Sequence, residues 1–346
     1  MTRALVVDDS HFMRTVITDI LEDHGIEVVA QAANGKEAVE LVEEYDPDVV
    51  TMDVEMPEMN GIEAVEAIMD RHPVPIMMLS ALTTEGAEST LDALEKGAVD
   101  FFAKPSGTIS TDLSVHADAL VQTLESVARS NPTAVTKRAV SPVRRTEEPS
   151  SYVKNPTLII GASTGGPNVV ESILAELPRA PDFRVLVVQH MPDQFTGRFA
   201  KRLDSASAYD VREATDGDRI GGGEALVAKG DYHLVVSQYN SGRLRVKLEQ
   251  SEPVHSVRPA IDVTMKSAAK KITDPITAVV LTGMGSDAAD GVVEIDRVGG
   301  TILAQNEETS AVFGIPGRAI ETGCVDDVRP ADELVDAILE TVQEEP

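Results

Sequence analysis

Polar residues that follow short apolar runs point to phosphate chemistry in the first third of the chain. Each run is too short for a buried helix, and amphipathic stretches of about 10 to 15 residues separate the runs, as a parallel sheet with crossover helices requires. The carboxyl ends of parallel strands meet at one edge of a sheet, so the polar residues should converge there. The runs are residues 4–7, 48–52, 76–79 and 101–103, and the polar residues after them are Asp8, Asp9, Asp53, Ser80 and Lys104.

The types of these residues suit a phosphate-accepting aspartate. Three carboxylates gathered at one place repel one another unless a hard divalent cation lies between them, and Mg²⁺ favours a few carboxylates completed by water and phosphate oxygens. Lys104 would neutralise phosphate charge, and the Ser80 hydroxyl could donate a hydrogen bond to the phosphate. Asp53 lies at the centre of the set and is the natural nucleophile for an acyl phosphate. Each aspartate alone is more often a helix N-cap, but the combination favours the phosphate site.

With these residues in place, positions 1–122 resemble the response-regulator receiver domain. The resemblance implies a flavodoxin-like fold, in which a five-stranded parallel sheet is doubly wound. It also implies Mg²⁺ held by Asp9, Asp53 and the backbone carbonyl of Glu55, with Asp8 acting through water. A histidine kinase would be the phosphodonor.

Composition limits what the rest of the chain can be. The chain has 346 residues, 42% of them hydrophobic, which is enough for two cores of ordinary size. We find no apolar stretch of about 18 residues and no amino-terminal signal pattern, so we expect a cytoplasmic protein without direct membrane insertion. The single cysteine, Cys324, excludes an intramolecular disulfide and a multi-cysteine zinc site. We expect a monomer.

The net charge is unusual. The chain has 58 Asp and Glu against 30 Lys and Arg, a formal charge of −28, where a magnitude of about 2 to 8 is usual for a small soluble domain. Halophilic proteins carry charge of this size, so we expect a salt-loving source, a halophilic archaeon. The same charge would repel nucleic-acid phosphates, so we expect no nucleic-acid partner.

Residues 123–154 have the composition of a flexible linker. This segment contains Pro132, Pro142 and Pro149, several serines and little periodic hydrophobicity. It is also locally basic, which leaves two interpretations open: a solvated flexible segment, or a tether that lies on an acidic domain surface. A second α/β domain should then occupy residues 155–346.

The second domain opens with an apolar run, 157–160, that leads directly into a glycine-rich turn. A Walker phosphate loop would need Gly-Lys-Ser/Thr, which is missing, and a dinucleotide fingerprint would need an acidic residue after the next strand. The pattern Gly-x-Ser-x-Gly around Ser163 fits a nucleophile elbow better. His190 follows the next apolar run, 184–188, and could act as the base.

An orienting carboxylate is available at the end of a further run. Asp287 follows the run 276–281 and could hold a histidine tautomer, although an aspartate here could equally cap the helix that begins after it. Glycines around Met284 would leave backbone N–H groups free for an oxyanion. The order Ser, His, Asp differs from that of ordinary α/β-hydrolases, so His233 and His255 stay rival bases on these grounds.

Residues 155–342 resemble the catalytic domain of the chemotaxis protein-glutamate methylesterases. The motifs that carry this resemblance are Gly-Ala-Ser-Thr-Gly-Gly-Pro at 161–167, Gln-His-Met-Pro at 189–192 and Thr-Gly-Met-Gly with the aspartate at 282–287. The resemblance implies Ser163 as the nucleophile, His190 as the general base and acid, and Asp287 as the orienting carboxylate. It also implies that Met284 supplies an oxyanion N–H, that Thr164 helps to position the histidine or substrate, and that the esterase needs no cofactor.

Together, the two resemblances predict a regulator with enzymatic output. Phosphorylation would activate hydrolysis of glutamate γ-methyl esters on chemoreceptors, giving glutamate and methanol for chemotactic adaptation. The family resemblance also implies deamidation of receptor glutamines. The alternative is a receiver-regulated, non-catalytic binding module that uses the glycine-rich loop at 161–166.

The charge generates a prediction about salt. Because the Debye length falls from about 10 Å at 0.1 M to about 3 Å at 1 M salt, screening should relieve self-repulsion and stabilise the fold. Thermal unfolding midpoints, measured by circular dichroism, should climb between those concentrations and continue upward in molar KCl. A flat or falling midpoint would contradict a halophilic origin of the charge.

Overall fold

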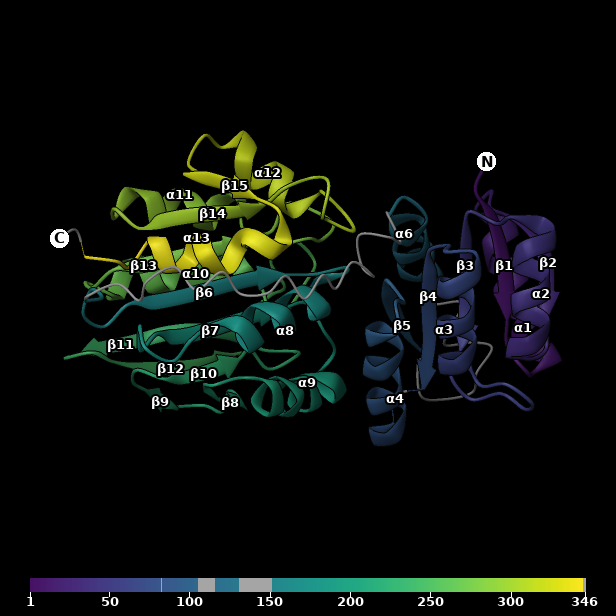
Figure 1. Cartoon of the computed structure of the whole chain (residues 1–346), viewed down its shortest axis with the longest axis horizontal. Helices are drawn as coiled ribbons and strands as arrows, with labels where there is room; N and C mark the ends of the chain where they lie inside the picture. Colours follow the sequence, from purple (N-terminus) through teal and green to yellow (C-terminus); the bar gives the residue numbers. More distant parts are fainter. Residues whose placement is uncertain (82, 105–115, 131–150, 345–346) are drawn as a thin grey trace. The chain divides into compact units, whose positions relative to one another are not determined.

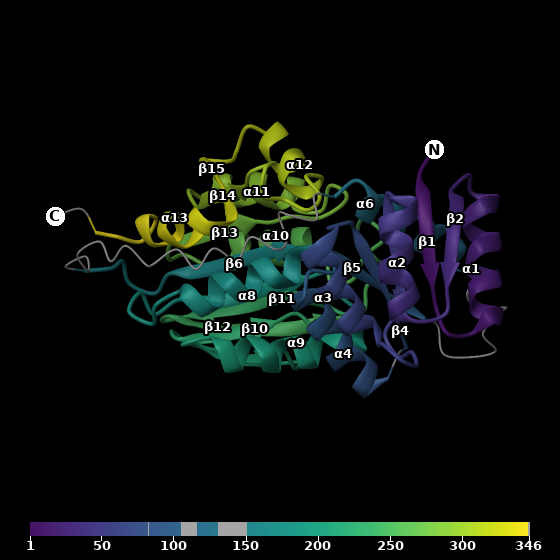
Figure 2. The same ribbon diagram turned by 45° about the vertical axis from the view of Figure 1, so that its right-hand side comes forward.

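The computed structural model describes residues 1–81, 83–104, 116–130 and 151–344. These residues divide into two units, one before and one after the segment 131–150. Each unit is built around its own parallel sheet (Figures 1 and 2). The α/β class and the order of the two units agree with the sequence prediction.

The first unit has a five-stranded parallel sheet with the order β2-β1-β3-β4-β5. This is the doubly wound arrangement that the receiver resemblance predicts. Its central strands are almost fully buried, because helices cover both of their faces. The strands are β1 (Arg3–Val7), β2 (Glu27–Ala32), β3 (Val49–Asp53), β4 (Ile76–Ala81) and β5 (Asp100–Lys104).

The helices of the first unit begin at side-chain caps that the sequence supplies. Asn60 and Glu63 form a capping box at α3, and Asn34 accepts a hydrogen bond from the first turn of α2. The last helix runs to Ala128, beyond residue 122, where we expected the domain to end; that boundary stays a prediction. The helices are α1 (His11–Asp23), α2 (Gly35–Tyr45), α3 (Gly61–Arg71), α4 (Thr84–Glu95) and α6 (Ala117–Ala128).

The second unit has a seven-stranded sheet with the order β15-β14-β13-β6-β7-β10-β8, and every pairing in it is parallel. The adjacent strands β6 and β7 are buried along their whole length, as expected for a sheet with both faces covered. The strands are β6 (Thr157–Ala162), β7 (Arg184–Gln189), β8 (Asp210–Glu213), β10 (Glu224–Val227), β13 (Ile276–Val280), β14 (Thr301–Gln305) and β15 (Asp327–Arg329).

Helices and a small antiparallel sheet complete the second unit. Helix α8 packs on α9 and α13, whereas α10 packs on α11 and on the small sheet. The helices are α8 (Gly166–Glu176), α9 (Asp193–Ala206), α10 (Ile261–Lys271), α11 (Ala289–Arg297), α12 (Ile315–Glu321) and α13 (Leu334–Glu340), with a short 3₁₀ turn, η1 (Ala331–Glu333). The small sheet consists of β9 (Arg219–Ile220), β11 (His233–Asn240) and β12 (Arg243–Glu249).

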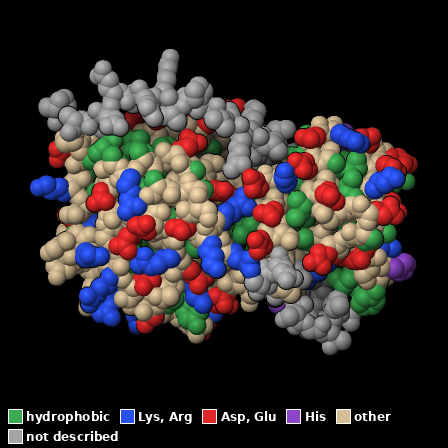
Figure 3. All heavy atoms as spheres, turned by 60° about the horizontal axis from the view of Figure 1, so that its bottom comes forward, with side chains coloured by type: hydrophobic (Ala, Val, Ile, Leu, Met, Phe, Trp, Pro, Cys, Tyr) green, Lys and Arg blue, Asp and Glu red, His purple; other side chains and the backbone are tan. Residues whose placement is uncertain are grey.

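Acidic side chains are spread over the surface rather than gathered in one segment. On the face drawn in Figure 3, they occur on both units and are interspersed with lysine and arginine. This distribution is expected where high charge adapts a whole surface to its solvent. Among the described residues, no helix has the length and hydrophobicity that crossing a membrane requires.

Candidate functional site

In the first unit, Lys104 bridges the two aspartates that end neighbouring strands. Its Nζ lies 2.9 Å from Oδ2 of Asp8 and 2.8 Å from Oδ1 of Asp53. The backbone N–H of Val54 also donates to Oδ1 of Asp53, at 2.8 Å. Oδ2 of Asp53 has no protein partner among the described residues.

This cluster is short of positive charge. Burial raises the pKa of Asp53 to about 6, against the opposing effect of Lys104, and the neighbouring charge of Asp8 raises it further. For Lys104, burial alone would lower the pKa, but the two carboxylates outweigh burial and raise it. The lysine therefore stays charged, and the carboxylates still favour an additional cation.

The residues present fit the magnesium ion that the receiver resemblance implies. Carboxylate oxygens of Asp8, Asp9 and Asp53 lie within 4.8 Å of one another, and such oxygens are the ligands that Mg²⁺ prefers. Glu55 follows two residues after Asp53, on the exposed loop that leaves β3.

Ser80 lies in the same unit, but its hydroxyl is turned toward α4. Thr90 donates a hydrogen bond to the Ser80 hydroxyl at 2.6 Å, and that hydroxyl donates to the carbonyl of Gly86 at 3.2 Å. For Ser80 to donate to a phosphate on Asp53, as the sequence predicts, its hydrogen bond to Gly86 must break.

In the second unit, Ser163 lies on a sharp turn between β6 and α8. Gly165 takes a left-handed conformation with φ 74°, and the N–H of Gly166 donates to the carbonyl of Ser163 at 2.8 Å. The neighbouring strands run alongside, so the N–H of Ser163 donates to Thr282 and the N–H of His190 donates to Ala162, both at 3.0 Å. Parallel pairing thus places Ser163 between the loops that carry His190 and Asp287.

The His190 ring is hydrogen-bonded to the Asp287 carboxylate. Nε2 of His190 lies 2.8 Å from Oδ2 of Asp287, and the exposed fractions of the two side chains are 11% and 2%. Burial alone would raise the pKa of Asp287, but His190 and the first backbone N–H groups of α10 outweigh burial and lower it. The carboxylate is therefore ionised at neutral pH and accepts a hydrogen bond from the Nε2–H group, which leaves Nδ1 as the basic nitrogen.

The structure does not join all three of these side chains. In the part of the chain that is described, the Ser163 hydroxyl makes no hydrogen bond with His190. Catalytic hydrogen bonds are often long or poorly aligned before substrate binds and tighten when it does.

The structure separates His190 from the rival histidines. His233 is fully buried, with Nε2 3.1 Å from the carbonyl of Glu252 and Nδ1 accepting from the N–H of Ala260 at 3.2 Å. His255 lies 2.8 Å from a different carboxylate, that of Asp262. Among the described histidines, His190 is the one whose ring bonds to Asp287.

Several backbone N–H groups at this edge of the sheet have no hydrogen-bond partner among the described residues. Among the described residues, the N–H groups of Met284 and Thr164 have no hydrogen-bond partner, and the Met284 side chain is exposed. The flanking Gly283 is different, because its N–H donates to Val312 at 2.9 Å. Thr164 itself is buried, and its carbonyl accepts from the Thr282 hydroxyl at 2.9 Å.

Sequence reasoning missed the residue that ties the serine loop to the histidine loop. Nε2 of Gln189 donates to the carbonyls of Ser163, at 2.9 Å, and His190, at 3.1 Å. Gln189 stands directly before His190 and is 2% exposed. A polar residue at the buried end of a strand was the available signal, since a buried amide must find partners.

One alternative interpretation of Asp287 is wrong. We allowed that it might cap the helix that follows it, but its carboxylate accepts from the N–H groups of Ile261 and Asp262, at 2.6 and 2.9 Å, in α10. The helix after Asp287 begins at Ala289, and its N-cap is Ala288, whose φ of 112° turns the chain away.

Comparisons with known proteins match both units. A family model described as CheB methylesterase matches residues 158–338, and one described as response regulator receiver domain matches residues 4–112. A solved structure of the CheB methylesterase catalytic domain from Thermotoga maritima has a TM-score of 0.51 and 39% identity, covering 53% of this chain and 97% of that one.

Curated relatives match the chain along its whole length. The relative from Halobacterium salinarum is 66% identical over 99% of each chain, and that from Natronomonas pharaonis is 57% identical over 99% of this chain and 98% of its own. A relative from Pyrococcus horikoshii is 44% identical over 99% and 94%. All three carry the name protein-glutamate methylesterase/protein-glutamine glutaminase. The family resemblance is confirmed, and relatives from halophilic archaea fit the salt-loving source that the charge predicts.

The raised pKa of Asp53 generates a prediction about Mg²⁺. Below about pH 6, an incoming ion must displace the Asp53 proton, so Mg²⁺ affinity in the full chain should fall as pH is lowered through that value. Without metal, the stability contributed by the raised pKa is present at low pH and lost as pH rises through about 6; Mg²⁺ should restore it.

Isothermal titration calorimetry at fixed salt between about pH 5 and pH 8 measures this dependence. The variant Asp53→Asn should bind Mg²⁺ more weakly and with less dependence on pH. An affinity of the wild-type chain that does not change over this range would contradict the site.

Proposed function

This chain belongs to the CheB methylesterase family, and on that premise we propose that it hydrolyses glutamate γ-methyl esters on chemoreceptors when its receiver is phosphorylated. The products would be glutamate and methanol, and the role would be chemotactic adaptation. The observation that carries the proposal is the hydrogen bond between His190 and the buried, ionised Asp287, beside the sharp turn that carries Ser163.

Acylation would begin at the Ser163 hydroxyl. Nδ1 of His190, left basic by the bond from Nε2 to Asp287, takes the hydroxyl proton while Oγ attacks the γ-carbonyl carbon of the ester. The negative oxygen of the tetrahedral intermediate would accept hydrogen bonds from the unpartnered N–H groups of Met284 and Thr164. The intermediate collapses when His190 gives its proton to the methoxy group, which leaves as methanol.

Deacylation would repeat these steps with water. His190 takes a proton from water, which attacks the acyl carbon, and then returns the proton to Ser163 Oγ as glutamate leaves. With a glutamine side chain, the first leaving group is ammonia, and the same acyl-enzyme follows. This common intermediate supports glutaminase activity at the same site.

The receiver would supply the control. Oδ2 of Asp53 attacks the phosphorus atom of a phosphohistidine on a chemotaxis histidine kinase, and the kinase imidazole leaves. Mg²⁺ held by Asp8, Asp9, Asp53 and the Glu55 carbonyl would neutralise charge on the phosphoryl group. Lys104 already contacts two of these carboxylates and would pair with a phosphate oxygen, joined by the Ser80 hydroxyl.

The alternative, a binding module without turnover, accounts for less of the structure. A phosphate-binding glycine loop needs free backbone N–H groups, but it needs no histidine hydrogen-bonded to an ionised aspartate at the next strand ends. Burying Asp287 costs free energy that His190 and the amides of α10 offset. A buried anion that is stabilised in this way is expected where an imidazolium must form beside it during a reaction.

The assignment of the triad predicts the effect of three substitutions. Ser163→Ala and His190→Ala should each abolish methanol release from methylated receptor membranes, because the hydroxyl is a poor nucleophile without its base. Asp287→Asn should lower kcat by about 10⁴-fold, since an amide favours the wrong histidine tautomer. Circular dichroism in high salt controls for folding. Near-normal turnover by folded Ser163→Ala would rule out the triad.

Phosphorylation makes a separate prediction. A small-molecule phosphodonor with Mg²⁺ should raise methanol release by the wild-type chain and leave the rate of Asp53→Asn unchanged. Both proteins should react with a serine-directed phosphonate at Ser163, which shows that the esterase is intact in the variant. Equal activation of the two proteins would mean that Asp53 is not the phosphoacceptor.

A further inference from the structure

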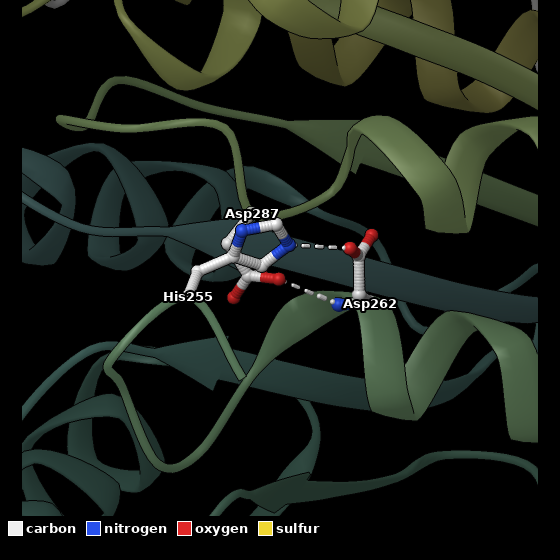
Figure 4. A group of neighbouring side chains, drawn as sticks. All are labelled: His255, Asp262 and Asp287. Atoms are coloured by element: carbon white, nitrogen blue, oxygen red, sulfur yellow. Dashed lines mark hydrogen bonds and ion pairs between the residues drawn. The ribbon is translucent and has the colours of Figure 1, made fainter. Parts of the chain in front are cut away.

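A second histidine–carboxylate pair lies beside the proposed triad. Nε2 of His255 lies 2.8 Å from Oδ2 of Asp262, and the backbone N–H of Asp262 donates to Oδ1 of Asp287 at 2.9 Å. Figure 4 shows the three side chains together, with both interactions dashed. Asp262 is 1% exposed and His255 is 33% exposed, so the pair links the buried acid to the surface.

Asp262 and Asp287 cap each other's helices. Asp287 accepts from the first N–H groups of α10, the helix that carries Asp262. Oδ1 of Asp262 accepts in return from Ala288, at 3.1 Å, and Gly291, at 2.6 Å, in the first turn of α11. Neither helix has a capping side chain of its own, because the N-cap residues are Ala260 and Ala288. The backbone that follows Asp287 is thus fixed through Asp262.

These contacts argue against a metal ion at this cluster. Both oxygens of Asp287 and Oδ1 of Asp262 already accept backbone N–H groups, and Oδ2 of Asp262 accepts from His255. Lys266 adds a further positive charge 3.9 Å from that last oxygen. A cation would have to displace these donors, so the cluster has the character of a support for the triad acid.

The position of His255 is strained, which suggests that its side chain has a role. The N–H and C=O groups of Val254 and Val257 pair across the turn at 3.2 and 3.0 Å, and the two residues between them, His255 and Ser256, have φ of 52° and 63°. Two-residue turns with both φ values positive strongly favour Asn-Gly. A β-carbon at both positions costs backbone energy, and such strain concentrates at functional sites.

We propose that Asp262, held by His255, is a positioning residue for the esterase reaction. The backbone N–H of Asp262 donates to Oδ1 of Asp287, and the carboxylate of Asp262 accepts from the N–H of Ala288, the residue after Asp287. Oδ2 of Asp287 is thereby directed at Nε2 of His190. His255 occupies Oδ2 of Asp262, so that Oδ1 alone serves the two N–H groups of α11. The Ser286 hydroxyl lies 3.4 Å from Nδ1 of His255, which favours the tautomer with its proton on Nε2. The inference rests on the proposed function.

The strained turn offers a variant that separates positioning from stability. His255→Asn relaxes the left-handed backbone but is too short to reach Asp262, so the thermal midpoint should hold or rise while kcat falls. Misplaced catalytic groups typically cost up to about 100-fold, and we expect a loss of about 10- to 100-fold with little change in KM. Ser256→Gly is the matched control: it relaxes the same turn, keeps the His255 contact and should retain the wild-type rate.

Double substitutions test whether the effect passes through Asp287. Once Asp287 is replaced by Asn, there is no carboxylate left to position, so adding His255→Asn or Asp262→Asn should change kcat within about twofold. Losses of the same size in the wild-type and Asp287→Asn backgrounds would overturn the proposal, as would a wild-type rate for folded His255→Asn. If Asp262→Asn does not fold, the comparison is made with His255→Asn alone, in the wild-type and Asp287→Asn backgrounds.

A spectroscopic measurement gives an independent readout. The far-downfield N–H proton of His190 that is shared with Asp287 should shift in His255→Asn and stay unchanged in Ser256→Gly. Identical His190 proton shifts in wild type and His255→Asn would contradict positioning.

The proposed function and the positioning role fail in different ways. If Asp287→Asn has normal activity, the triad is wrong. If Asp287→Asn is inactive and His255→Asn is fully active, only the positioning role is rejected.

Discussion

The donors that face a buried carboxylate decide what each half of this protein can do. Asp53 ends a parallel strand, Asp287 lies on the loop that follows another, and both are largely buried. The pKa of Asp53 is raised to about 6, because burial and Asp8 outweigh the single Lys104. The pKa of Asp287 is lowered, because His190 and two helix N–H groups outweigh burial. The same residue type therefore serves two purposes. Asp53 still needs a cation, whereas Asp287 is an anion that can hold an imidazolium.

Close approach between loops keeps these donors in place. A β-carbon on Gly61 would lie 2.0 Å from the carbonyl oxygen of Asp53, so α3 can begin there only with glycine. In the second unit, a β-carbon on Gly283 would lie 2.6 Å from Cβ of Ser163. Both glycines let a neighbouring backbone pass against the reactive residue, which a side chain would push away.

The sequence predicts those parts of the site that lie along single strands. The apolar runs that precede Asp53, His190 and Asp287 were visible because periodicity reports which segments are strands, and parallel strands share an edge. The contacts that join strands were not visible. These contacts are hydrogen bonds to residues far away in the chain, made by Gln189, Thr282 and Asp262. In the sequence alone, the same residue types would fit ordinary turns or helix caps.

The wrong interpretation of Asp287 has the same origin. Capping rules relate an aspartate to the helix that follows it in sequence. Here the chain turns at Ala288, with φ of 112°, and the carboxylate meets the start of α10 instead. Local propensity was overridden by a contact between two loops that are 25 residues apart. The direction of the Ser80 hydroxyl, set by Thr90 on α4, could not be read from sequence for the same reason.

High salt should therefore act differently on the surface and on the sites. The net charge of −28 is carried largely by exposed side chains, whose mutual repulsion acts over distances that salt screens. The bonds at the esterase site join groups 2.6 to 2.9 Å apart that are almost fully buried, as in Ile261 to Asp287 and His190 to Asp287. Screening by mobile ions is weak for such buried pairs, because ions cannot enter between them. A chain can in this way change its surface charge for a saline solvent and keep the geometry of its chemistry unaltered.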